Sequence, residues 1–190
     1  LLISFITFKP VLTLGKKFNF VDKPDFKSTH LTPKVRIGGL IIFCGFIASI
    51  SLSLIYLYYL SYLGNISQLN IILTGSALIF FLGFLDDIYK LSSFLRLFVQ
   101  FLIVIFMFFK GINIQSIDLS WLLNNVSDLQ LPFVISLIFT SFWIVGIINS
   151  FNWMDGLDGL LTGSGIIYSA GLCFYNYMEG SIINLIISVS

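Results

Sequence analysis

The sequence predicts an all-α protein that crosses a membrane several times. Of its 190 residues, 57% are hydrophobic and only 10% are charged, and the mean hydropathy is +1.00. Soluble domains carry about 25% charged residues, and a membrane-spanning helix needs about 20 mostly apolar ones. We therefore expect a polytopic transmembrane helix bundle of six to seven spans, with a short extracytoplasmic hairpin near residues 111–130.

Uncharged runs place the first four spans. Residues 1–14 form the end of a first apolar segment, and residues 15–36 are polar. Residues 37–85 contain no charged side chain, which is long enough for two spans with a turn at 64–68. The apolar run 97–109 is the core of a fourth span.

The second half of the chain adds the hairpin and three more spans. Residues 111–130 alternate loosely between apolar and polar side chains, which predicts a short hairpin outside the bilayer. Residues 131–148 and 159–178 read as the fifth and sixth spans, and a seventh begins after residue 181. We expect one transmembrane catalytic domain over residues 1–190, truncated at both ends because the chain starts and stops inside apolar segments.

Basic residues orient these spans. They concentrate in two polar loops: Lys16, Lys17, Lys23, Lys27, Lys34 and Arg36 in the first, and Lys90 and Arg96 in the second. The positive-inside rule then places residues 15–36, 86–96 and 149–159 on the cytoplasmic side. This orientation gathers four carboxylates from different helices on one face of the membrane: Asp86, Asp87, Asp155 and Asp158.

Asp86 and Asp87 are followed by Lys90, which on a helix is four and three residues away from them and within reach of either. Adjacent helical residues point about 100° apart, so the two acids are expected to have different roles. The alternative interpretation is an interfacial charge cluster that only marks the membrane boundary.

A second polar cluster repeats at every third position: Asn149, Asn152, Asp155 and Asp158. Three-residue steps drift by about 60° on an α-helix, so these side chains share one face only where the helix tightens or breaks. Gly156 and Gly159 favour a break. The alternative is a helix-capping loop, since Asn, Asp and Gly are all common at helix ends.

Clustered carboxylates at a membrane surface are typical ligands for Mg²⁺, which binds one or two carboxylates together with substrate phosphates. Such an ion stabilises charge in phosphoryl transfer. Basic side chains of the first polar loop are candidates to hold further phosphate charge: Lys27, His30, Lys34 and Arg36. The alternative for these residues is topology or contact with lipid headgroups. The net charge of +1 gives no indication of nucleic-acid binding.

Three motifs together resemble the polyprenyl-phosphate N-acetylhexosamine-1-phosphate transferases. The stretch Asp22 to Gly39 resembles the first cytoplasmic loop of that family, with His30, Pro33, Arg36 and the Gly38–Gly39 pair in the family's pattern. Asp86–Asp87–x–x–Lys90 resembles its aspartate pair. Asn149–x–x–Asn152–x–x–Asp155–Gly–x–Asp158–Gly–Leu160 resembles its third-loop signature. The motifs occur in the family's order, and the resemblance covers essentially the whole chain.

The resemblance implies transfer of N-acetylhexosamine-1-phosphate from a UDP-sugar to undecaprenyl phosphate, with Mg²⁺ or Mn²⁺ as cofactor. It implies a multi-pass protein of the bacterial cytoplasmic membrane, with its active site on the cytoplasmic face. The first-loop pattern resembles the branch that starts O-antigen, common antigen, teichoic acid or capsule synthesis. The partners are the UDP-N-acetylhexosamine, undecaprenyl phosphate and the lipid bilayer; the oligomeric state, a homodimer included, stays open.

The resemblance also implies residue roles. The catalytic set is Asp86, Asp87, Asp155 and Asp158; the substrate-binding set is Lys27, His30, Arg36, Lys90, Asn149 and Asn152; the metal set is Asp86, Asp87 and Asn152. Lys27 and Val35 stand where the family often carries Arg and Pro. A later acidic motif and a histidine-containing loop of the family would lie beyond Ser190, so we expect residues 1–190 alone to show no transfer.

Two other classes of protein compete with this interpretation. An ion-coupled transporter would use intramembrane carboxylates, but it favours acids near mid-span and an inverted repeat. Here the acids lie at the ends of predicted spans, and no repeat is visible. A structural membrane scaffold would not need acids and amides at three-residue spacing.

Overall fold

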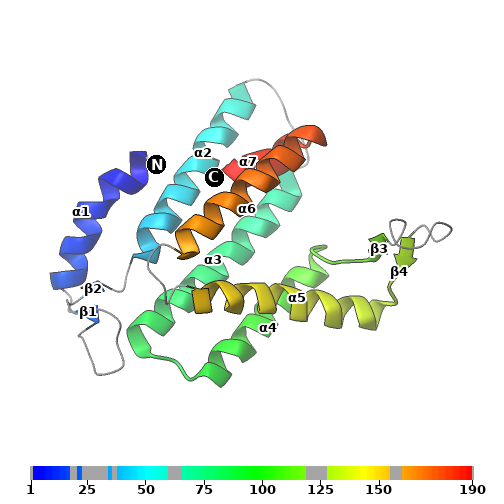
Figure 1. The fold of residues 1–190 in the computed structure, drawn as a ribbon, viewed down its shortest axis with the longest axis horizontal. Helices are drawn as coiled ribbons and strands as arrows, with labels where there is room; N and C mark the ends of the chain where they lie inside the picture. Colours follow the sequence, from blue (N-terminus) through cyan, green and yellow to red (C-terminus); the bar gives the residue numbers. More distant parts are fainter. Residues whose placement is uncertain are drawn as a thin grey trace. The chain divides into compact units, whose positions relative to one another are not determined.

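The computed structural model describes residues 2–17, 21–22, 34–35, 38–59, 66–118, 128–154 and 160–189. Its helices are α1 (Leu2–Lys17), α2 (Gly39–Tyr59), α3 (Ile66–Tyr89), α4 (Ser93–Phe109), α5 (Phe133–Met154), α6 (Leu160–Met178) and α7 (Ile182–Val189). Its strands are β1 (Val21–Asp22), β2 (Lys34–Val35), β3 (Ser116–Asp118) and β4 (Asp128–Gln130). The described chain is mostly helical, as the sequence predicts (Figure 1).

By length and composition, two of the described helices can cross a membrane: Leu69–Tyr89 of α3 and Phe133–Met154 of α5. Two shorter apolar helical stretches are Gly39–Ile55 and Ser93–Phe109. Only 11% and 22% of the apolar windows of α3 and α5 are buried within the protein, whereas a core helix of a soluble protein would be mostly buried. The helices therefore fit an all-α membrane protein, and the number of six to seven spans stays a prediction.

The chain divides into two compact units. The first comprises Leu1–Ile66, Phe80–Leu91 and Ile167–Ser190, and the second Ser67–Ile79 and Ser92–Ile166. Helices α3 and α6 each contribute to both units. The prediction of one catalytic domain over 1–190 is not tested by this division.

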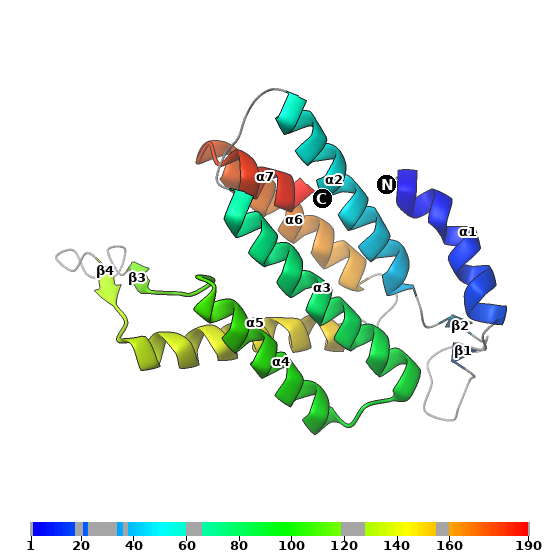
Figure 2. The same ribbon diagram turned by 180° about the vertical axis from the view of Figure 1, so that it is seen from behind.

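In the first unit, α1 lies beside α2, as two opposite views agree (Figures 1 and 2), and α7 also contacts α2. Phe43 of α2 stacks on Phe80 of α3 with ring centroids 3.9 Å apart. Within the first polar loop, β1 pairs antiparallel with β2, so that Asp22 is opposite Lys34. This strand pair, which the sequence does not predict, draws the two ends of the loop together.

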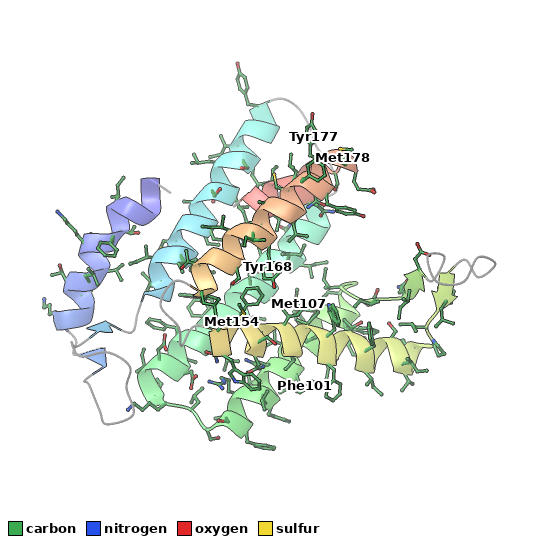
Figure 3. The ribbon with its side chains drawn as sticks, viewed as in Figure 1. Phe101, Met107, Met154, Tyr168, Tyr177 and Met178 are labelled. Carbon is green, nitrogen blue, oxygen red and sulfur yellow. The ribbon has the colours of Figure 1, made fainter. Side chains whose placement is uncertain are left out.

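In the second unit, α4 packs against α5, and Phe101 of α4 is labelled in Figure 3. The ring of Phe101 meets that of Phe142 in α5 edge to face, with the centroids 5.2 Å apart. Gly75 of α3 lies against Met107 of α4, where a Cβ would stand 2.6 Å from the sulfur. An apolar cavity of about 300 Å³ lies among α3, α4 and α5, with Gly75, Val104 and Ile144 in its lining.

The hairpin predicted near residues 111–130 is confirmed. Strands β3 and β4 pair antiparallel, with Ile117 opposite Leu129. The segment between α4 and β3 is fastened to α5 by two hydroxyls: Ser136 donates to the carbonyl of Ile114 at 2.6 Å, and the Ile114 N–H donates to Thr140 at 3.0 Å. Both backbone groups of Ile114 are thus satisfied inside an apolar unit, where unpaired ones would be costly. The side of the membrane on which the hairpin lies stays a prediction.

Candidate functional site

The acid pair stands on the last turn of α3, in the first unit. Asp86 is half-buried and Asp87 is exposed, and that last turn holds no basic residue. The predicted polar loop over 86–96 is therefore shorter than expected, because α3 continues to Tyr89 and α4 begins at Ser93. The C-terminal end of a helix carries partial negative charge and disfavours carboxylates. Two acids at this position gain most when a cation binds beside them.

Lys90 follows the helix in a conformation that the sequence did not predict. Its φ is +50°, in the left-handed region, and its N–H donates to the Asp86 carbonyl at 2.8 Å. This is the αL helix end in which Gly is the usual residue. Lys90 thus lies just past the end of α3, and the i+3 and i+4 spacing expected for a lysine within the helix does not apply to it. A side chain other than Gly costs about 1–2 kcal/mol in this conformation.

Asn149 and Asn152 lie on the last turns of α5, in the second unit. The predicted fifth span was expected to end near residue 148, but no helix breaker interrupts 149–154 and α5 continues to Met154. Both residues therefore stand on regular α-helix, about 60° apart in direction. Asn149 is half-buried and Asn152 is exposed. The next described residue is Leu160, where α6 begins.

Asn149 is held by two acceptors. Its amide nitrogen donates to Oε1 of Gln100 in α4 at 2.7 Å and to the Val145 carbonyl at 2.8 Å. Gln100 is only 4% exposed, although the residues around it in α4 are almost all apolar. Gln100 lies outside the three sequence motifs. A single buried amide within an otherwise apolar span is the signal that could have found it.

Five of the predicted site residues fall outside the described part of the chain: Lys27, His30, Arg36, Asp155 and Asp158. Among the described residues, no group of three acidic, His or Cys side chains gathers as a metal site would require. The structure brings Asp86, Asp87 and Lys90 together at the end of α3, and Asn149 and Asn152 together on α5. The meeting of these two sets in one pocket stays a prediction.

The described donors fit a hard divalent cation in their chemistry. Asp86 and Asp87 offer carboxylate oxygens at a helix end without a basic neighbour in its last turn. Mg²⁺ prefers one or two carboxylates and takes its other oxygen ligands from substrate phosphates and water. The three metal ligands predicted from the family remain Asp86, Asp87 and Asn152.

Comparison with known proteins gives the family. The family model described as glycosyl transferase family 4 matches residues 69–190, more than half of the chain. That segment begins in α3 and includes the acid pair, α4, the β3–β4 hairpin and both asparagines. No solved structure matches the chain.

Curated relatives extend the match along the chain. A probable undecaprenyl-phosphate N-acetylglucosaminyl 1-phosphate transferase of Bacillus subtilis (strain 168) is 27% identical over 99% of this chain and 49% of its own length. An undecaprenyl-phosphate alpha-N-acetylglucosaminyl 1-phosphate transferase of Thermotoga maritima is 29% identical over 88% of this chain and 47% of its own. A decaprenyl-phosphate N-acetylglucosaminephosphotransferase of Mycobacterium tuberculosis (strain ATCC 25618 / H37Rv) is 25% identical over 92% and 43%.

The chain spans about half the length of the curated relatives that it matches. The family model matches residues 69–190, which is more than half of the chain. The chain belongs to glycosyl transferase family 4.

Proposed function

We propose that the full-length protein transfers N-acetylhexosamine-1-phosphate from a UDP-sugar to undecaprenyl phosphate, as the first membrane step of a cell-envelope polysaccharide. The family match and the printed activities of the relatives support this reaction. The observation that carries the proposal is the placement of the adjacent carboxylates of Asp86 and Asp87 on the last turn of α3. A bound cation would be favourable there, because the C-terminal end of a helix carries partial negative charge.

In the proposed mechanism, Mg²⁺ or Mn²⁺ bound by Asp86, Asp87 and Asn152 would neutralise phosphate charge, which is the main requirement of phosphoryl transfer. A phosphate monoester has its second pKa near 6, so the acceptor phosphate is largely dianionic at neutral pH and needs little help from a base. Asp86 takes the residual proton. Lys90 contributes positive charge to the diphosphate.

The remaining predicted roles belong to residues outside the described ranges. Arg36, His30 and Lys27 hold further phosphate charge, and Asp155 and Asp158 order the nucleotide end of the site. We place the site on the cytoplasmic face of the bacterial inner membrane, because the basic loops are on that side in the predicted orientation. A one-step transfer and a covalent aspartyl intermediate both remain open within this proposal.

The transporter alternative gains no support from the described helices. Asp86 and Asp87 lie at the end of α3 and not near its middle, whereas a proton or Na⁺ relay uses acids at membrane depth. We therefore propose no second function.

The test is a transfer assay on the full-length protein in detergent or vesicles. Labelled UDP-N-acetylglucosamine, undecaprenyl phosphate and Mg²⁺ should give a labelled lipid product and an equal amount of UMP. A folded, full-length protein that forms no lipid product with UDP-N-acetylglucosamine or UDP-N-acetylgalactosamine contradicts the proposal. Product formation without a divalent cation contradicts its metal requirement.

A further inference from the structure

Asn149 has its orientation fixed by two hydrogen bonds. An amide NH₂ group carries two hydrogens, and the nitrogen of Asn149 donates one to Gln100 Oε1 at 2.7 Å and one to the Val145 carbonyl at 2.8 Å. The Val145 carbonyl can only accept, so it determines which end of the amide faces it. Gln100 must then present its oxygen, and not its nitrogen, to Asn149.

These two bonds determine which hydrogen-bonding atom of Asn149 remains for a ligand. Both of its N–H groups are used within the protein, so its remaining hydrogen-bonding atom is Oδ1, which only accepts. A free Asn can turn either end toward a ligand, but an Asn held in this way cannot donate to a phosphate oxygen. Its natural partner is a group with a hydrogen to give, such as a sugar hydroxyl or an amide N–H.

Gln100 is in a position to enforce this choice. It is 4% exposed and lies on α4, a helix that packs directly against α5. The low dielectric around a buried amide strengthens its hydrogen bonds and makes an unpaired one costly. Rotation of the Asn149 amide would break the bond to Gln100 and place its oxygen against the Val145 carbonyl.

We propose that Gln100 is a positioning residue: it holds Asn149 so that Oδ1 accepts a hydrogen bond from a hydroxyl or N–H group of the sugar nucleotide. This inference rests on the proposed transfer function and adds to it a residue outside the three motifs. It also assigns Asn149 the role of acceptor, which its residue type alone does not decide.

The test uses four variants of the full-length protein: Gln100→Met, Gln100→Glu, Asn149→Leu and the double variant Gln100→Met/Asn149→Leu. Met keeps the shape of Gln but removes the acceptor, and Glu keeps an acceptor oxygen. We expect Gln100→Met to lower kcat/KM for the UDP-sugar about tenfold, the effect typical of an outer residue that orients a direct ligand. We expect Gln100→Glu to retain most of the activity.

The double variant separates positioning from simple packing. If Gln100 acts through Asn149, adding Gln100→Met to Asn149→Leu should cause no further loss of kcat/KM, since coupled residues are not additive. The KM for undecaprenyl phosphate should stay unchanged in Gln100→Met, because the contact at issue is with the sugar nucleotide.

Thr140→Val is the matched control. Like Gln100, Thr140 is a buried polar residue that joins two segments. It lies on α5, and its hydroxyl accepts a hydrogen bond from the Ile114 N–H. It should lower thermal stability without coupling to Asn149 in kcat/KM. Equal losses from Gln100→Met in both Asn149 backgrounds, or equal losses from Gln100→Glu and Gln100→Met, overturn the inference.

The outcomes also separate this inference from the function beneath it. If the wild-type protein transfers sugar phosphate but Asn149→Leu keeps full kcat/KM, the positioning role of Gln100 is contradicted and the proposed function is supported. If the folded wild-type protein shows no transfer, both the positioning role and the proposed function are contradicted. If Gln100→Met is not recovered in folded form, Gln100→Glu decides: activity as low as that of Asn149→Leu overturns the inference.

Discussion

The acidic end of α3 and the polar side of α5 differ in what their polar groups contact. The acidic end of α3 comprises Asp86, Asp87 and Lys90. The polar side of α5 comprises Ser136, Thr140, Ser141 and Asn149. At the acidic end of α3 two acids occupy the unfavourable end of a helix dipole, and a lysine occupies a backbone conformation suited to Gly. On the polar side of α5, side chains are buried or half-buried, and three of them make hydrogen bonds to segments of the same unit.

This difference indicates that the polar residues of the two regions have different roles, one functional and the other structural. Residues at the acidic end of α3 occupy positions that the helix dipole and the backbone conformation disfavour, and such positions are common at functional sites. On the polar side of α5, Ser136 and Thr140 bond to the backbone of Ile114 near β3, and Asn149 bonds to Gln100 of α4. These bonds fix the helix against its neighbouring segments. Substitutions at the acidic end should therefore reduce activity, and those on the polar side should mainly reduce stability. Asn149 is the exception, because it belongs to both the scaffold and the predicted site.

The largest effect is expected at the acid pair. Asp86→Asn and Asp87→Asn in the full-length protein should each lower kcat by about a hundredfold or more, because several kcal/mol of charge stabilisation depend on the bound metal. The measurement is steady-state transfer with UDP-N-acetylglucosamine and undecaprenyl phosphate. If both variants keep near-normal kcat, the acidic end of α3 is not part of the active site.

The matched control for these substitutions is Asp118→Asn. Asp118 is an exposed carboxylate in β3, opposite Asp128 in the strand register. Asn keeps the shape of Asp and removes only its charge, and surface substitutions usually change stability by no more than about 0.5 kcal/mol, so this variant should keep full activity and a stability close to that of the wild type.

Lys90 should separate stability from activity. In Lys90→Gly the left-handed backbone no longer crowds a Cβ, which should raise the free energy of unfolding by about 1 kcal/mol. The same change removes a positive charge from the proposed diphosphate site and should lower kcat/KM about tenfold, a loss of about 1.4 kcal/mol of transition-state stabilisation. Thermal unfolding in detergent and transfer kinetics measure the two effects.

Lys90→Arg is the companion variant, since it keeps the charge and the strain. It should retain more activity than Lys90→Gly and gain no stability. A Lys90→Gly protein that is fully active would show that the strained lysine has no role in the reaction.

Thr140 should show the opposite behaviour. Thr140→Val keeps the shape of the side chain but leaves the Ile114 N–H without its acceptor, which should lower the free energy of unfolding by about 1–3 kcal/mol. Transfer activity at a temperature where the protein is folded should stay within about twofold of wild type, since surface and scaffold changes act mainly on stability. A large loss of kcat without a loss of stability would contradict the division between the two regions.

The helices could be predicted from the sequence because long uncharged runs leave little choice of structure. The end of α3 near residue 90 and the β3–β4 hairpin follow the polar residues there. The turn predicted at 64–68 was too long, because α3 already begins at Ile66. The strand pair β1–β2 was missed because two-residue strands show no alternating pattern within a loop rich in Lys. The extension of α5 through Asn152 does not follow from hydropathy, because the polar residues after 148 favour the end of an apolar span although nothing in 149–154 breaks a helix.

The candidate site was predictable only as a set of motifs. Sequence spacing places Asp86 and Asp87 at a helix end, and this is where they are found. Two features could not be predicted from spacing alone. The left-handed conformation of Lys90 depends on where α3 stops, and the bond between Gln100 and Asn149 joins residues 49 positions apart that meet only through helix packing.

The most direct test of this account is the binding of Mn²⁺ to the purified full-length protein in the presence of UDP, followed by electron paramagnetic resonance. The wild-type protein should bind one Mn²⁺ ion per chain, and the double variant Asp86→Asn/Asp87→Asn should bind it at least about tenfold more weakly, since carboxylates are the ligands that hold such an ion. Asp118→Asn should bind as the wild type does. Equal Mn²⁺ affinity in the wild type and in the folded double variant would contradict the claim that the acidic end of α3 holds the catalytic metal.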